Sequence, residues 1–248
     1  MKWISLLTLA LSFSSQLGLA LPLEDVPLET LNLIRKLPHT GRGEGLDYSG
    51  GYLWEAEGNQ KIIKKISPAT GKVFRTFSSP TLYPESIIWI TSEKMLHIDF
   101  KRPDVAVGTI SSSNIVRWEL LGKLRALGFG MAKRTSTSFW VSGYFSPKIH
   151  LYSYPGLSIL RTITTPLDSV EDLAWDGTHL WASDYTDLNE RVIYRLSPTT
   201  GNILGRYTLP GTSTCERIDG IAIRGEEMFI TGKSCGLYVV EKPELLYR

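Results

Sequence analysis

Apolar pairs recur along the chain at a nearly constant interval. The five pairs are Leu53-Trp54, Leu96-His97, Phe139-Trp140, Leu180-Trp181 and Met228-Phe229. Their second members are separated by 43, 43, 41 and 48 residues. Short apolar stretches and turn residues surround each pair, and no stretch has the 3.6-residue periodicity of a helix. Because a repeat of about 40–45 residues built from short strands is typical of propeller blades, we expect an all-β, five-bladed β-propeller.

Two of the repeats match each other without a gap. Residues 45–54 and 172–181 each have the pattern of a strand, a glycine-containing turn and a second strand. Each continues into a third strand that ends in the motif Ser-Pro-x-Thr-Gly, at 67–71 and 197–201. Proline early in a turn and glycine near its end favour a tight reversal, so a fourth strand follows in each blade.

The two ends of the chain predict how the ring closes. Only a short tail follows the strand at 237–241, and the apolar segment 31–37 has no earlier partner. We expect this N-terminal strand to complete the last blade, because the pairing buries two sheet edges. Residues 1–20 have the pattern of a cleaved signal peptide. An exposed lead-in at 21–29 and a single propeller domain at 30–248 follow.

Composition and charge narrow the class of partner. The chain has 248 residues, a net charge of +2, 42% hydrophobic and 21% charged residues. A charge this close to neutral argues against nucleic acid or an anionic membrane surface, and no other segment approaches the length of a transmembrane helix. We therefore expect a secreted or extracytoplasmic monomer that binds a peptide or small molecule in its central channel, and neither nucleic acid nor membrane.

Two cysteines flank a predicted hairpin near the C-terminus. Cys215 and Cys235 each lie ten residues from Gly225, the expected centre of the turn. Their sulfurs would then face each other at the open end of the hairpin. An exported protein can oxidise such a pair, which predicts a disulfide; the alternative is two free thiols on neighbouring strands.

Aligning the repeats brings one position of each blade into register, at the start of its first strand. The residues there are Glu44, Glu85, Phe129, Glu171 and Asp219. Because the first strand of a propeller blade is innermost, we expect these residues to form a ring at the channel mouth. Like charges in a narrow ring raise at least one pKa unless a cation compensates them. Candidate cations are Arg42, Lys101 and Lys233.

The ring suits two kinds of chemistry. Paired carboxylates suit proton transfer, whereas oxygen-only ligands would suit Ca²⁺ better than Zn²⁺. We expect no required cofactor, with Ca²⁺ in the acidic ring as the alternative. Acids near turns also commonly cap backbone groups, and Trp54, Trp140 and Trp181 are expected to pack in the core. The chain lacks a nucleophile elbow, a P-loop and a dinucleotide fingerprint, which argues against serine hydrolases and nucleotide enzymes.

Several short motifs resemble those of plant and bacterial-type glutaminyl cyclases. They are Leu37-Pro38-His39, Glu44-Gly45-Leu46, Thr70-Gly71-Lys72-Val73 and the segment 229–233. That family consists of five-bladed propellers that convert N-terminal glutamine to pyroglutamate and release ammonia. The resemblance implies that Glu85 carries protons and that Lys233 biases the charge of that carboxylate, while the α-amine of the substrate attacks its own side-chain amide.

The expected substrate-binding residues form the rest of the mouth. They are Glu44, Phe129, Glu171, Tyr185, Asp219 and Lys101. The resemblance would place tryptophan at the positions of Phe129, Lys101 and Tyr185, and asparagine at that of Glu171, so the pocket here is more charged. Two alternatives follow: a non-catalytic propeller that binds a cationic ligand or peptide, and a metal-dependent hydrolase that resembles Ca²⁺-containing sugar-lactone hydrolases.

Overall fold

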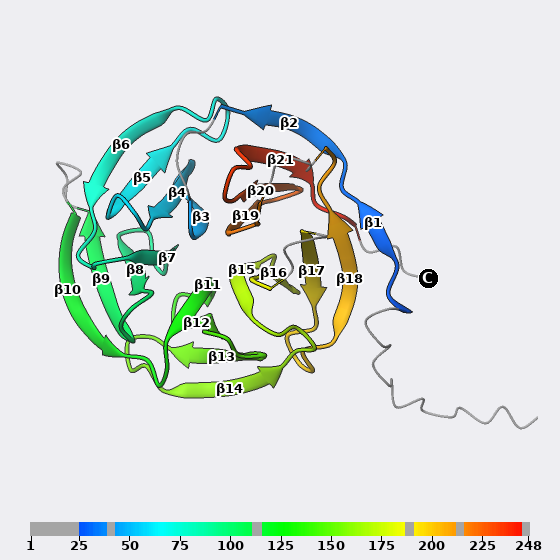
Figure 1. Ribbon diagram of the computed structural model, residues 1–248. Helices are drawn as coiled ribbons and strands as arrows, with labels where there is room; N and C mark the ends of the chain where they lie inside the picture. The colour runs from blue at the N-terminus through cyan, green and yellow to red at the C-terminus, as the bar shows by residue number, and fades with distance from the viewer. Residues whose placement is uncertain (1–24, 39–42, 111–115, 187–190, 212–215, 245–248) are drawn as a thin grey trace, which may run out of the picture.

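The chain forms a ring of five β-sheets. The computed structural model describes residues 25–38, 43–110, 116–186, 191–211 and 216–244. Within these ranges the sheets surround a central axis and no α-helix occurs (Figure 1). The expected five-bladed propeller is therefore confirmed. No helix in the described part of the chain has the length and apolar character that a membrane span requires.

Each blade runs from the axis outwards in chain order, so its first strand is innermost (Figure 1). Blade one contains β3 (Leu46–Ser49), β4 (Tyr52–Glu57), β5 (Ile62–Ile66) and β6 (Val73–Ser78). Blade two contains β7 (Pro84–Trp89), β8 (Lys94–Asp99), β9 (Asp104–Ile110) and β10 (Val116–Lys123). Blade three contains β11 (Gly128–Thr135), β12 (Ser138–Gly143), β13 (Lys148–Ser153) and β14 (Ile159–Thr164). Blade four contains β15 (Val170–Trp175), β16 (Leu180–Asp184), β17 (Val192–Leu196) and β18 (Ile203–Thr208). Blade five contains β19 (Gly220–Arg224), β20 (Glu227–Thr231) and β21 (Leu237–Glu241).

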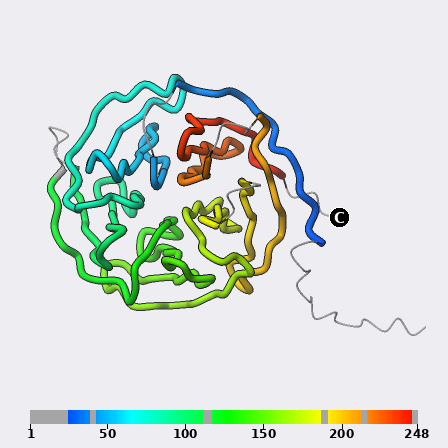
Figure 2. The backbone as a smooth tube through the Cα atoms, viewed as in Figure 1, coloured from blue at the N-terminus to red at the C-terminus, as the bar shows by residue number. Residues whose placement is uncertain are grey.

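An N-terminal strand completes blade five, as expected. Strand β2 (Leu33–Leu37) pairs antiparallel with β21, with Leu37 opposite Leu237. The N-terminal segment, blue in Figure 2, runs along the outside of the last two blades. Pairing of the two chain ends leaves no gap in the ring, so the blades hold one another in place.

The segment before β2 is partly built into blade four rather than being only an exposed lead-in. Strand β1 (Leu28–Thr30) pairs parallel with β18 and gives blade four a fifth strand. The side chains of β1 are exposed, but Val26 just before it is buried in an apolar cluster with residues of blade four. The expected signal peptide at 1–20 lies outside the described residues, so it stays a prediction.

The recurring apolar pairs form the core between blades. All of their residues are buried. Trp54 packs with Ile87 and Met95 of the next blade, and Trp181 packs with Ile221 in the same way. His97 is buried and fully hydrogen-bonded, with Nδ1 2.9 Å from the carbonyl oxygen of Ser86. Burial lowers the pKa of His97 to about 4, so it packs as a neutral ring.

The Ser-Pro-x-Thr-Gly motif has a steric reason for its glycine. Gly71 and Gly201 adopt left-handed backbone conformations, with φ of 71° and 82°. A Cβ atom at these positions would lie 2.3 Å from the carbonyl oxygen of Pro38 and 2.2 Å from that of Thr164. Both turns therefore need glycine, because any side chain would strike the backbone of the preceding blade.

Two carboxylates near the axis also join adjacent blades by accepting hydrogen bonds from backbone amides. Asp47 accepts a hydrogen bond from the N–H of Trp89 at 2.7 Å, joining blades one and two. Asp172 accepts one from the N–H of Ile221 at 2.8 Å, joining blades four and five. These carboxylates satisfy amides that strand pairing leaves free. Burial raises the pKa of Asp172 well above its usual value, outweighing the hydrogen bonds that it accepts.

We predict that the stability of the Asp172→Asn variant, relative to wild type, increases as pH rises. A carboxyl whose pKa is raised by folding contributes stability below its unfolded pKa, and that contribution is lost as pH rises through the folded pKa. Asparagine keeps an acceptor for Ile221 but does not ionise. The free energy of unfolding, measured by urea denaturation from pH 4 to pH 8, should therefore shift in favour of the variant. The exposed Asp168→Asn is the control, and parallel pH curves for Asp172→Asn and wild type would contradict the assignment.

Candidate active site at the channel mouth

A small cavity of about 60 Å³ lies at the end of the channel where the first strands begin. Its lining is Glu44, Tyr83, Glu85, Phe100, Phe129, Glu171, Tyr185 and Arg217. Five of these residues, all except Tyr83, Phe100 and Arg217, were expected from the sequence. The structure therefore brings together side chains from all blades, because the repeat places each ring position at or just before an innermost strand.

The four acids of the ring are all buried. Glu44 is 3% exposed, Glu85 4%, Glu171 3% and Asp219 1%. Glu44 accepts a hydrogen bond of 2.6 Å from the hydroxyl of Tyr83. Asp219 lies behind the cavity, where its Oδ2 accepts the backbone N–H of Lys233 at 2.9 Å. Burial of this much negative charge requires a compensating cation or bound protons.

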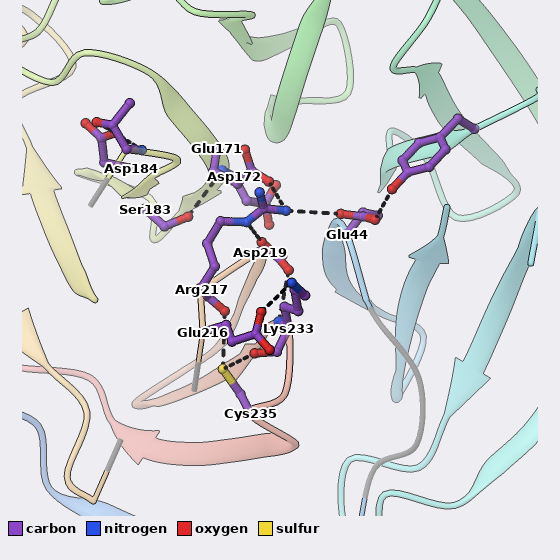
Figure 3. A network of polar contacts seen from close by, with 12 residues as sticks. Glu44, Glu171, Asp172, Ser183, Asp184, Glu216, Arg217, Asp219, Lys233 and Cys235 are labelled. Carbon is purple, nitrogen blue, oxygen red and sulfur yellow. Dashed lines mark hydrogen bonds and ion pairs between the residues drawn. The ribbon is translucent and has the colours of Figure 1, made fainter. Parts of the chain in front are cut away.

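Arg217 is the cation at the centre of the cluster (Figure 3). Its Nη2 lies 3.1 Å from Oε1 of Glu171 and 3.7 Å from Oε2 of Glu44, and its Nε donates to Asp219. The guanidinium also lies over the ring of Tyr185, 4.4 Å from the centroid. Burial alone would lower the pKa of Arg217, but the neighbouring carboxylates outweigh it and raise the pKa. Arg217 therefore stays charged in this site.

The cations expected from the sequence lie elsewhere. The ammonium of Lys233 forms an ion pair with Glu216, both of them largely exposed. The ammonium of Lys101 lies 5.9 Å from the centroid of the Tyr83 ring, outside the cavity lining. Arg42 lies outside the described residues. Sequence reasoning missed Arg217, although its place two residues before the ring position Asp219 is the signal that could have found it, since alternate residues of an extended segment share a side.

Aromatic rings cover one side of the mouth. The residue directly after the second strand of the blade is Phe100 in blade two, Tyr144 in blade three and Tyr185 in blade four. Phe129 stacks between Phe100 and Tyr185, with centroid distances of 5.6 Å to each, and meets the edge of Tyr144 at 4.8 Å. Phe100 therefore takes the place in the mouth that was expected for Lys101. The sequence contains a signal for this position, because an aspartate precedes the aromatic residue both at 99–100 and at 184–185.

In blades one and five, the residue directly after the second strand is a glycine, Gly58 or Gly232. A Cβ atom on Gly58 would lie 2.4 Å from the ring of Tyr83 and 3.0 Å from Oε1 of Glu44. A Cβ atom on Gly232 would lie 1.9 Å from the carbonyl oxygen of Arg217. The two glycines therefore leave the space into which Tyr83 and the segment of Arg217 fit, and the mouth becomes aromatic on one side and charged on the other.

The carboxyl of Glu85 is the group most suited to exchange a proton. Its Oε2 is buried and has no hydrogen-bond partner among the described residues. Oε2 of Glu171 is also buried without one, but the other oxygen of Glu171 pairs with Arg217. Burial, followed by the charges of Glu171 and Glu44, raises its pKa well above the ordinary glutamate value, and Arg217 opposes the shift. The sequence predicted a raised pKa from repulsion alone, whereas burial is the larger cause. A carboxyl of this kind takes and returns a proton nearer to neutral pH.

Three of the four ring acids lie close enough together to bind a metal ion. One oxygen each of Glu44, Glu85 and Glu171 lies within 4.8 Å of the others, so this acidic triad could hold a cation. However, the guanidinium of Arg217 already lies within 4 Å of two of them. A divalent cation at their centre would be repelled at short range, so the donor set fits shared protons and Arg217 better than it fits Ca²⁺.

The predicted disulfide stays a prediction. Cys215 lies outside the described residues. Cys235 is 1% exposed, and its Sγ lies 3.2 Å from the carbonyl oxygen of Arg217 (Figure 3). A disulfide bond at Cys235 would therefore constrain the backbone segment that carries Arg217.

The fold and the mouth together define a five-bladed propeller with a buried carboxylate cluster beside aromatic rings. No family model and no curated protein matches the chain. Among solved structures, it is similar to the glutaminyl cyclase of Myxococcus xanthus, with a TM-score of 0.73 and 14% identity over 88% of this chain and 99% of that one. The WD40 propeller domain of Doa1 matches with a TM-score of 0.52 and 14% identity, over 81% of this chain and 63% of that one. At these identities the likeness supports the fold.

We predict that Arg217→Met destabilises the protein, and more so at high pH. Removing one partner of a buried ion pair leaves uncompensated charge and costs about 3 kcal/mol. The loss should be larger at pH 8 than at pH 5, because Glu171, whose pKa is raised by burial, relieves it by binding a proton at the lower pH.

Urea denaturation at both pH values measures this effect. Adding Glu171→Gln to Arg217→Met should restore part of the loss at pH 8. Arg224→Met, which removes a more exposed ion pair with Glu227, is the matched control and should cost little at either pH. A loss in Arg217→Met that does not change with pH would contradict the charge assignment.

Proposed function

We propose that the mouth cyclises an N-terminal glutaminyl residue to pyroglutamate, with Glu85 as the proton-transfer group. The observation that carries the proposal is the buried Oε2 of Glu85, which has no hydrogen-bond partner among the described residues and lies in a cavity lined by aromatic rings. Likeness in fold to a glutaminyl cyclase supports the same choice. Aromatic faces and carboxylates are also what an α-ammonium group binds, so the substrate amine has partners here.

The reaction needs one proton to move within the site. The α-amine nitrogen forms a bond to the side-chain amide carbon while one of its protons passes to Glu85. Glu85 then gives that proton to the amide nitrogen, the bond from that nitrogen to the carbon breaks, and ammonia leaves. The same carboxyl acts first as base and then as acid, which is efficient when its pKa is raised towards the working pH.

We assign to Arg217 the electrostatic role that the resemblance gives to Lys233. Arg217 contacts Glu171 and Asp219 directly, whereas the ammonium of Lys233 pairs with Glu216. Burial raises the pKa of Glu171 as well, but the guanidinium 3.1 Å away opposes that rise. We therefore assign to Glu85, in its ionised form, the uptake and return of the proton. Phe129 and Tyr185 form the apolar wall against which the glutaminyl side chain packs.

We further infer that the protein acts outside the cytoplasm, as a monomer, on peptides that expose N-terminal glutamine. The signal-peptide pattern and the predicted pairing of Cys215 with Cys235 support this setting. Non-catalytic binding of a cationic peptide is the alternative that the charged mouth favours, and turnover distinguishes the two.

We predict that Glu85→Gln lowers ammonia release from a glutamine-leading peptide by at least about a hundredfold, because it removes the proton-transfer group. Its melting temperature should be equal to or above that of wild type, since a buried ionisable group is lost. Glu93→Gln, an exposed change in the same blade, is the control. Retained turnover in Glu85→Gln would contradict the assigned role, and binding without any turnover by wild type would favour the non-catalytic alternative.

We also predict that a chelator changes neither the melting temperature nor the activity. Arg217 supplies positive charge to the cluster, so loss of a divalent cation should remove nothing from it. Thermal denaturation and ammonia release, each measured with and without EDTA, check this. A drop in either that Ca²⁺ restores would instead support the metal-dependent alternative.

A further inference from the structure

Phe145 is an exposed aromatic side chain at the rim of the cavity. It directly follows Tyr144 and is 55% exposed. Its ring centroid lies 4.5 Å from that of Tyr144, 5.4 Å from that of Tyr185 and 6.4 Å from that of Phe129. Tyr144, Phe145 and Tyr185 thus form a continuous aromatic shelf that begins in the cavity wall and ends in solvent.

The backbone conformation of Phe145 is one that a bulky side chain disfavours. Phe145 has a φ of 42°, in the left-handed region that bulky residues rarely adopt. The loops after the second strand of three other blades contain a left-handed residue too, and these are Lys61, Arg191 and Ser234. All three are polar, as expected for an exposed turn. The side chain of Phe145 stays more than half exposed, so burial in the core does not account for a phenylalanine in this strained conformation.

The size of the cavity indicates where the rest of a substrate must lie. Pockets that enclose a drug-sized ligand are about 300–1,000 Å³, whereas this cavity is about 60 Å³. It therefore admits only the reacting end of a peptide, and the next residue must lie on the rim. The aromatic shelf forms the rim on one side of the cavity.

We propose that the aromatic shelf binds the side chain of the second residue of the peptide, so that the site selects substrates with an aromatic or large apolar residue there. This inference rests on the proposed function, because it takes the residue in the cavity to be the N-terminal glutamine. An aromatic side chain on the shelf would meet the edges and faces of three rings in the geometry that aromatic pairs prefer.

The test compares two peptide amides, Gln-Phe-NH₂ and Gln-Gly-NH₂. Wild type should have a kcat/KM about fivefold higher for the phenylalanine peptide, as expected for one added aromatic contact. In Phe145→Ala the ratio should fall to about one, and Phe145→Tyr should keep it. The control is Phe74→Ala, because Phe74 is equally exposed, at 57%, on the outer strand of blade one. A ratio near one in wild type, or a ratio unchanged in Phe145→Ala, would overturn the proposal.

Binding measurements separate this inference from the proposed reaction. Calorimetric titration of the Glu85→Gln variant with both peptides reports affinity without turnover. A preference for Gln-Phe-NH₂ that Phe145→Ala abolishes, with no turnover by wild type, would support the shelf and contradict cyclisation. Turnover without any preference would contradict the shelf alone. Thermal denaturation of each variant checks that it is folded.

Discussion

Closure of the ring is the constraint on which the rest of this structure depends. Strand β2 pairs with β21 and joins the two ends of the chain, and the five first strands are then held around one axis. Residues such as Glu44 and Asp219, at opposite ends of the sequence, come within reach of one guanidinium only because of this pairing. Buried carboxylates that accept backbone amides of the next blade, as Asp172 does, reinforce the same arrangement.

The mouth concentrates more negative charge than its surroundings can solvate. Glu44, Glu85, Glu171 and Asp219 are all buried, and in the described part of the chain Arg217 is the cation that contacts three of them. The imbalance leaves Glu85 with a raised pKa and a buried oxygen that has no partner among the described residues. The aromatic wall from blades two to four excludes water from one side, which strengthens each of these electrostatic interactions. Proton transfer is the chemistry that such an arrangement supports.

The repeat made the fold and much of the mouth predictable from the sequence. The apolar pairs are core residues at the same place in every blade, so their spacing predicts the blades, and the ring acids follow from the same register. Phe100 escaped prediction because blade two has one residue fewer between its pair and the following loop, which shifted the alignment to Lys101. Arg217 escaped prediction because it lies in a loop between blades, outside the aligned positions, although its spacing of two residues from Asp219 carries a signal. The backbone of Lys233 lies where expected, beside Asp219, but the direction of a long exposed side chain is set by its partner Glu216.

The protonation of Glu85 is the most direct test of this account. Carbon-13 NMR of protein labelled at the glutamate carboxyl carbon follows each glutamate through a pH titration, and the signal missing from Glu85→Gln identifies Glu85. We predict that this signal titrates well above the ordinary glutamate pKa of about 4.3, and that its pKa is higher still in Arg217→Met. Titration of Glu85 at or below that ordinary value would contradict the claim that the channel mouth holds an exchangeable proton.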